Sequence, residues 1–251
     1  METPFWRHID AGDGLHVAFS SVRAGNLSLN AGVRGADDQH AARRQVLGNR
    51  RALEAQMGIS PQSLRFLHQV HSADVLDVAD VADRTLSTVE EEPPVGDAWI
   101  SADAGTPLAI MVADCLPVMF VGRAEDGAAL SAGAHAGRVG LLTGVLENTV
   151  AALRRAGAAQ ISAWIGPAAC GSCYEVPEAM RQESSRHRPA LVSETSWGTP
   201  ALNLRGEAAA VLRTQGVEVH DLGGCTIEDD SLFSHRRAPE QGRFAGLVWR
   251  A

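Results

Sequence analysis

Residues 111–120 read MVADCLPVMF and lie in the most hydrophobic segment of the chain. Asp114 and Cys115 interrupt two apolar runs, and Pro117 follows. Val or Leu would build a buried strand more easily at both positions, because a buried carboxylate without a partner is costly. The segment therefore predicts two short strands, 108–112 and 117–121, joined where the acid and the thiol stand.

Strands and helices follow one another along the rest of the chain. Asp37 and Asp38 can cap a helix in which apolar residues recur at near-helical spacing. Helices are expected at 39–57, 137–157, 175–187 and 201–215, and further strands at 14–22, 63–70, 73–78, 98–100, 128–134, 161–166, 217–222 and 244–249. The acidic, Pro-rich residues 90–97 are typical of an exposed loop. The pattern predicts one α/β domain over 1–251, with long helices packed on mixed sheet.

Composition excludes several function classes. The net charge of −8 over 251 residues gives no reason to expect a nucleic-acid or anionic-membrane partner. No window holds the roughly 18 apolar residues of a membrane span, and METPFWRHID lacks the features of a secretory signal, so a cytoplasmic protein is expected. All 22 basic residues are Arg, which excludes a Schiff-base or Walker lysine. Anions must be held by Arg, backbone amides or a metal.

The chain has four cysteines, and a disulfide framework is not expected in a chain of this length without a secretory signal. Cys170 and Cys173 form a C-x-x-C that could be half a zinc site or a redox pair. No second C-x-x-C accompanies it, which favours a structural or pocket-lining role. Cys225 is most simply interpreted as a buried thiol.

Three residues share a position where a predicted strand ends in a turn: His71, Cys115 and His135. One thiolate and two imidazoles suit Zn²⁺ and leave a fourth position open, as in a catalytic site. Each residue also has a simpler interpretation, a packed thiol or a satisfied core histidine. A third interpretation makes Cys115 a nucleophile and His135 its base. The residues alone leave these alternatives open.

Several motifs occur in an order that resembles a known family. They are QVHSADV, GDAWIS, LAIMVADCLPVMF, GAHAG, IGPAACGSCYEV, and CTIEDDSLFSHRR followed by GRFAGLVW. From about residue 18 to 250 the chain resembles the YfiH family, also called peptidoglycan editing factors or laccase-like domain proteins. The resemblance implies a YfiH-like α/β/β/α fold of layered mixed sheets flanked by helices. It also implies a zinc site of His71, Cys115 and His135, with Asp114 as a catalytic or substrate contact.

The resemblance further implies zinc-dependent phosphorolysis of adenosine, inosine or methylthioadenosine, with nucleoside and phosphate as substrates, and deamination of adenosine. It also carries a role in peptidoglycan correction and an older assignment as copper polyphenol oxidases. Copper is disfavoured, because a trinuclear centre needs several His-x-His pairs and none of the nine histidines forms one. His68 and His71, three residues apart on a strand, would point to opposite faces.

Two departures from the family bear on the substrate. The common HAGWRG is HAGRVG here, so Val139 occupies the usual Arg position and Arg138 is its nearest replacement. The N-terminal glycine-rich segment is shortened. The candidate substrate contacts are Arg23, Asn30, Arg138, Tyr174, Arg236 and Arg237.

Two rivals to the zinc nucleoside enzyme stay open. One is a Cys-His hydrolase that cleaves an amide in a cell-wall precursor, with Cys115 as nucleophile. The other is a pocket-bearing partner protein without activity, which the missing family arginine favours. The sequence predicts no oligomeric state.

Overall fold

The computed structural model describes residues 3–81 and 93–251. One sheet has four strands in the order β1-β2-β12-β5, and every neighbouring pair is antiparallel. Its strands are β1 (Phe5–Gly12), β2 (Leu15–Ser20), β5 (Leu108–Val112) and β12 (Phe244–Arg250). The predicted strands 14–22, 108–112 and 244–249 lie in this sheet, and β1 is an addition that the sequence analysis missed.

The second sheet is mixed and has six strands in the order β11-β8-β6-β7-β4-β3. The outer pairs β11–β8 and β3–β4 are parallel, and the inner pairs are antiparallel. Its strands are β3 (Val75–Asp77), β4 (Ala98–Ser101), β6 (Leu116–Arg123), β7 (Ala129–Ala136), β8 (Gln160–Ile165) and β11 (Glu218–Asp221). Strands β6 and β7 are buried along almost their whole length, which explains their continuous apolar runs.

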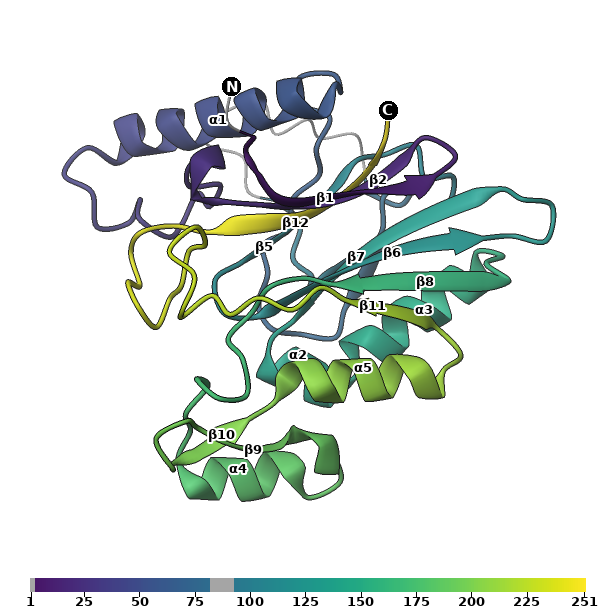
Figure 1. The fold of residues 1–251 in the computed structure, drawn as a ribbon. Helices are drawn as coiled ribbons and strands as arrows, with labels where there is room; N and C mark the ends of the chain where they lie inside the picture. The colour runs from purple at the N-terminus through teal and green to yellow at the C-terminus, as the bar shows by residue number, and fades with distance from the viewer. Residues whose placement is uncertain (1–2, 82–92) are drawn as a thin grey trace.

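The two sheets face each other and helices cover their outer faces (Figure 1). Phe19, Ile110 and Val248 of the four-stranded sheet share one core with Trp99 and Met119 of the six-stranded sheet. Helix α1 (Gln39–Met57) packs on the outer face of the four-stranded sheet. Helices α2 (Arg138–Thr143), α3 (Val145–Arg155) and α5 (Leu204–Thr214) cover the outer face of the other sheet. The expected α/β/β/α arrangement is therefore confirmed.

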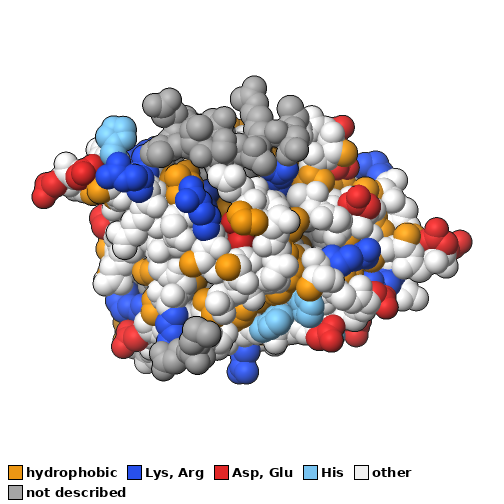
Figure 2. All heavy atoms as spheres, turned by 90° about the horizontal axis from the view of Figure 1, so that it is seen from above, with side chains coloured by type: hydrophobic (Ala, Val, Ile, Leu, Met, Phe, Trp, Pro, Cys, Tyr) orange, Lys and Arg blue, Asp and Glu red, His pale blue; other side chains and the backbone are white. Residues whose placement is uncertain are grey.

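A small extension completes the fold. It contains α4 (Glu178–Ser185), a 3₁₀ turn at Pro189–Leu191 and the two-stranded sheet of β9 (Val192–Glu194) and β10 (Pro200–Leu202), whereas a second 3₁₀ turn, Val22–Ala24, follows β2. Figure 2 looks down from the α1 side and shows basic, acidic and hydrophobic side chains interspersed on that face. Among the described residues, no helix is long and apolar enough to cross a membrane.

The chain passes from one sheet to the other at the segment that opened the sequence analysis. β5 ends at Val112 in the four-stranded sheet, and β6 begins at Leu116 in the six-stranded sheet. Asp114 sits between them with φ of 86°, a left-handed conformation that Asp tolerates better than most residues. Asp114 and Cys115 thus interrupt the apolar run because they form the turn between two layers.

Two predictions about local structure were wrong, and a third was wrong in part. Residues 63–70 form no strand and only make isolated bridges, at Arg65 and His68. The single helix expected over 137–157 is two helices, because Gly144 with φ of 98° ends α2 and starts α3. Residues 90–92 of the expected exposed loop lie outside the described residues, and its last residue, Asp97, is fully buried.

Candidate metal centre

His71, Cys115 and His135 come together from three separate places in the fold. Their ligand atoms, one from each side chain, all lie within 4.8 Å of one another. Cys115 immediately precedes β6, His135 is the penultimate residue of the neighbouring strand β7, and His71 lies in the loop before β3. The Cys115 Sγ atom is 3.7 Å from His71 Nε2, and the two imidazole centroids are 4.7 Å apart.

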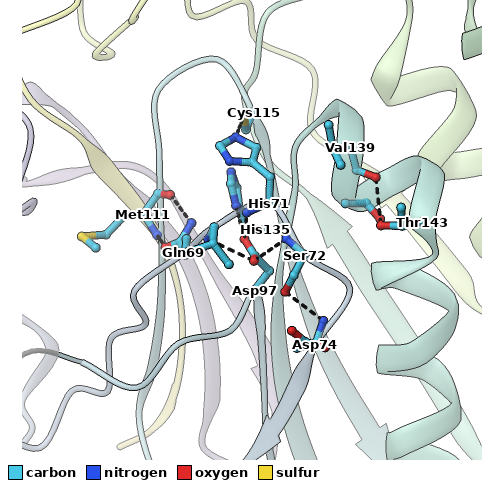
Figure 3. Close-up of polar contacts among 12 residues, drawn as sticks. Gln69, His71, Ser72, Asp74, Asp97, Met111, Cys115, His135, Val139 and Thr143 are labelled. Carbon is cyan, nitrogen blue, oxygen red and sulfur yellow. Dashed lines mark hydrogen bonds and ion pairs between the residues drawn. The ribbon is translucent and has the colours of Figure 1, made fainter.

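The Asp97 carboxylate holds His71 and His135 in position through hydrogen bonds (Figure 3). Its Oδ1 atom accepts a hydrogen bond from His135 Nδ1 at 2.7 Å and another from the His71 backbone N–H at 3.0 Å. Its Oδ2 atom accepts from the backbone N–H groups of Val70 and Ser72. Because Nδ1 of His135 is engaged, Nε2 is the nitrogen left to act as a ligand. The same carboxylate holds the His71 loop, in which φ of His71 is 64°.

The electrostatics of the site favour a thiolate at Cys115. Burial opposes ionisation, but the charge of His135 and hydrogen bonds from His135 and His71 outweigh it and lower the pKa of Cys115 to about 6. Burial disfavours the charged imidazole of His135, but Cys115 and the hydrogen bond to Asp97 raise its pKa to about 9. Burial alone would raise the pKa of Asp97, yet its hydrogen bonds to His135, Ser72 and Val70 keep that pKa below its usual value.

Gly137 leaves the space that the His71 and Cys115 side chains occupy. A Cβ at this position would lie 2.5 Å from His71 Cδ2 and 3.1 Å from Cys115 Sγ. Its φ of −68° is ordinary, so the backbone would accept another residue and only the crowding forbids it. The glycine of GAHAG is therefore required by the site and not by a turn.

A cavity of about 560 Å³ opens beside the three residues. This volume lies in the range typical of small-molecule sites, roughly 300–1,000 Å³. Asn30, a predicted substrate contact, lines it. The cavity wall also includes several polar or charged residues that the sequence analysis did not select: Ser28, Arg34, His68, Gln69, His235, Glu240 and Arg243.

His68 and His71 line the same cavity, contrary to the expectation that they point to opposite faces. That expectation assumed a strand, and the segment is instead a loop. Gln69 holds this loop against β5, since its amide donates to Met111 O at 2.7 Å and accepts from Met111 N at 2.9 Å.

Asp114 faces away from the three ligands toward the C-terminal loop. Its Oδ1 atom accepts a hydrogen bond of 2.6 Å from the Thr226 hydroxyl, and Oδ2 accepts one of 2.8 Å from the backbone N–H of Arg236. Asp114 is not among the residues that line the cavity. Both contacts indicate that Asp114 positions the loop between β11 and β12, residues 222–243, next to Cys115.

Tyr174, Arg236 and Arg138 gather on another side of Cys115. The Arg236 guanidinium lies over the Tyr174 ring, 4.6 Å from its centroid. Burial raises the pKa of Tyr174, and the nearby charge of Cys115 raises it further, whereas Arg236 and Arg138 oppose the shift. Arg138 also donates to the Ser184 hydroxyl at 3.4 Å. None of these three side chains is among the residues that line the 560 Å³ cavity.

The two other predicted arginine contacts lie elsewhere. The Arg237 guanidinium donates to the backbone carbonyls of Thr226, Ile227, Asp229 and Leu232, so it braces the C-terminal loop. Arg23 lies in the 3₁₀ turn Val22–Ala24, outside the lining of the cavity.

Arg243, like Arg34, lines the cavity and was not selected in the sequence analysis. It lies at the start of GRFAGLVW, a motif quoted only for the resemblance. Burial lowers its pKa, while the nearby charges of Cys115, Asp114 and Glu240 oppose the shift. Arg243 also approaches His235, with Nη2 to Nδ1 at 3.4 Å. Asp97 was missed in the same way, inside the motif GDAWIS.

A second cluster of possible ligands contains Cys170, Cys173, Cys225 and Glu228, again with ligand atoms all within 4.8 Å of one another. Cys225 is only partly buried, and it approaches the C-x-x-C pair from 52 residues further along the chain. The interpretation of Cys225 as a buried thiol was therefore wrong.

Comparison with known proteins places the geometry in context. A family model described as multi-copper polyphenol oxidoreductase laccase matches residues 18–251. A purine nucleoside phosphorylase of Streptomyces coelicolor is 40% identical, over 96% of this chain and 97% of its own. The crystal structure of Neisseria meningitidis protein NMB0706, of the DUF152 family, has a TM-score of 0.76 at 29% identity and 99% coverage of both chains. Bacillus licheniformis YfiH shares the fold, with a TM-score of 0.81 at 24% identity over 100% and 98% of the two chains. The predicted resemblance is confirmed.

Proposed function

The chain belongs to the family described as multi-copper polyphenol oxidoreductase laccase, and on that premise we propose that it catalyses phosphorolysis of purine nucleosides at a zinc centre. The proposed ligands are His71, Cys115 and His135. The observation that carries the proposal is their convergence within 4.8 Å at the wall of a 560 Å³ cavity. Support comes from relatives named purine nucleoside phosphorylase in Streptomyces coelicolor and Corynebacterium glutamicum.

The residues fit zinc on their own chemistry. One thiolate and two imidazoles are ligands that Zn²⁺ prefers, and three protein ligands leave a position open, as catalytic sites require. Asp97 already fixes the His135 tautomer that exposes Nε2. Zinc bound here would supply a Lewis acid that polarises an oxygen of a substrate.

The chain's own residues would hold the substrates. Without Lys, Arg is the cationic side chain available to bind phosphate, and Arg243 lines the cavity close to Cys115. Arg34 lines the same cavity from the loop before α1, and Asn30 offers an amide to the nucleoside. A cavity that holds both substrates together lowers the entropic cost of bringing phosphate to the anomeric carbon of the ribose. Arg138, Tyr174 and Arg236 would close the opposite side.

We propose adenosine deamination as a second reaction of the same centre, in which water attacks the purine carbon that carries the amino group and ammonia leaves. Copper polyphenol oxidation is not proposed, although the family description names it. None of the nine histidines forms a His-x-His pair, so the sequence lacks the ligands of a trinuclear copper cluster.

One observation favours a second candidate function, a Cys-His hydrolase. Asp97, His135 and Cys115 are arranged in space like the orienting acid, the base and the nucleophile of a catalytic triad. The pKa of Cys115 is also lowered. The position of His71 argues against it, because its Nε2 atom lies 3.7 Å from the same sulfur and such a triad needs no second imidazole.

The test is phosphate-dependent release of the base from inosine and adenosine, with the sugar product identified by ³¹P NMR. The proposal predicts ribose 1-phosphate in amounts equal to the free base, and loss of both products in Cys115→Ser. Base release that is independent of phosphate would contradict it, as would an unchanged rate in Cys115→Ser.

A further inference from the structure

Three thiols and a carboxylate converge outside the proposed reaction centre. Cys170 and Cys173 come from the loop after β8, and Cys225 and Glu228 come from the loop after β11. Their ligand atoms lie within 4.8 Å of one another. The proposed function uses none of the four.

Two tight turns present these side chains. The Cys170 carbonyl accepts hydrogen bonds from the backbone N–H groups of Cys173 (3.0 Å) and Tyr174 (2.9 Å). The Cys225 carbonyl likewise accepts from the N–H groups of Glu228 (3.2 Å) and Asp229 (2.9 Å). Each turn therefore brings its first and fourth residues together, so that each contributes a pair of ligands.

Backbone contacts fix the two turns against each other. Ala168 and Cys225 form a parallel bridge, and the Thr226 N–H donates to Ala168 O at 3.1 Å. The Ala168 N–H donates in turn to Gly224 O at 3.4 Å. These backbone contacts hold the turn that carries Cys170 and Cys173 beside the turn that carries Cys225 and Glu228.

We propose that Cys170, Cys173, Cys225 and Glu228 bind a second zinc ion in a closed, structural site. Zn–S bonds of about 2.3 Å in a tetrahedron place two sulfurs roughly 3.8 Å apart, which the observed spread of ligand atoms accommodates. On binding, the three thiols release their protons and the carboxylate completes the tetrahedron. A disulfide would use two of the sulfurs and leave the third sulfur and the carboxylate without a role.

The cluster lies next to residues that contact Asp114, so a zinc ion bound there would stabilise the surroundings of Cys115. The Ala169 N–H donates to Asp114 O at 2.9 Å, and the Thr226 hydroxyl donates to the Asp114 carboxylate. Each of these two residues adjoins a proposed zinc ligand, and Asp114 precedes Cys115. Tyr174 follows Cys173 and lies under Arg236. A zinc that joins the two turns would hold the wall of the reaction centre in place.

The test is zinc content per folded chain, measured by mass spectrometry of protein purified without chelators under reducing conditions. Wild type should contain two zinc ions, Cys225→Ser one and Cys115→Ser one. The inference does not depend on the proposed function, because it concerns metal content and not activity. If the proposed reaction centre binds no zinc, wild type should contain one zinc ion, which Cys115→Ser keeps and Cys225→Ser loses, and the inference still holds.

A second measurement needs no substitution within the cluster. In Cys115→Ser, all three remaining thiols should resist alkylation until a strong chelator is added, with release of one zinc. The inference is overturned if they react at once, or if the intact mass shows a disulfide. It is also overturned if wild type contains one zinc that Cys115→Ser loses and Cys225→Ser keeps.

Discussion

Replacement of Asp97 by Asn should weaken the proposed metal centre without removing a ligand. Asp97 is fully buried and accepts four hydrogen bonds, from His135 Nδ1 and from the backbone of Val70, His71 and Ser72. Asn keeps one oxygen and presents an NH₂ group in place of the other. In either orientation this NH₂ group faces N–H groups that donate to Asp97 in the wild type.

The size of the effect follows from the lost partners. If the NH₂ group faces Val70 and Ser72, two hydrogen bonds to a charged acceptor are lost, each worth roughly 1.5–3 kcal/mol. If it faces His135, the imidazole must accept through Nδ1 and protonate Nε2, which then cannot bind a metal. We expect zinc affinity to fall about 10–100-fold, and the metal-free protein to lose roughly 3–6 kcal/mol of unfolding free energy.

Zinc affinity is measured by competition with a chromophoric chelator, and stability by urea unfolding. Asp103→Asn is the matched control, because Asp103 is exposed and accepts from Gly105 N and Ser101 Oγ in a turn away from the site. The control should keep its zinc affinity and lose at most about 1 kcal/mol. A folded Asp97→Asn protein with zinc affinity within twofold of wild type would refute the reasoning.

Three further predictions concern the same site. Gly137→Ala should lower zinc affinity at least tenfold, because the added methyl group would crowd His71 and Cys115. The control Gly48→Ala should not lower it, because a Cβ at Gly48 in α1 would have no atom within 4 Å. Equal affinities of the two variants in a zinc titration would contradict this prediction. In metal-free protein the lowered pKa of Cys115 means that its thiolate persists down to about pH 6, so its alkylation rate should rise through pH 6; a rise near pH 9 would show an ordinary thiol. Arg243→Gln should raise the KM for phosphate at least tenfold and change the rate of deamination little. Arg138→Gln should raise the KM for phosphate less. The reverse order in steady-state kinetics would place phosphate beside Arg138.

The residues alone predicted most strands and helices because their signals are local, whereas the layered arrangement was predicted from the family resemblance. Apolar runs such as 108–112 and 117–121, and the Asp38 cap of α1, identify each element from its own residues. β1 was missed because its residues are largely exposed and its pattern is polar. The break at Gly144 was missed because the apolar stripe continues across it into α3.

Side chains that serve the site from a distance were harder to predict. His71, Cys115 and His135 were selected because thiolate and imidazole have a recognisable metal chemistry. Asp97 follows a Pro-rich acidic stretch and is typical of a loop in sequence, and only the fold reveals four donors around its carboxylate. Cys225 joins Cys170 only through the pairing of Ala168 with Cys225, a contact that spacing cannot reveal.

The most direct measurement of the central claim is X-ray diffraction from crystals of the purified protein, recorded above and below the zinc absorption edge. The account predicts an anomalous peak bonded to Cys115 Sγ at about 2.3 Å and to the Nε2 atom of His135 and a ring nitrogen of His71 at about 2.0–2.1 Å. A difference map without zinc among these three side chains, in crystals grown from zinc-replete protein, would contradict it.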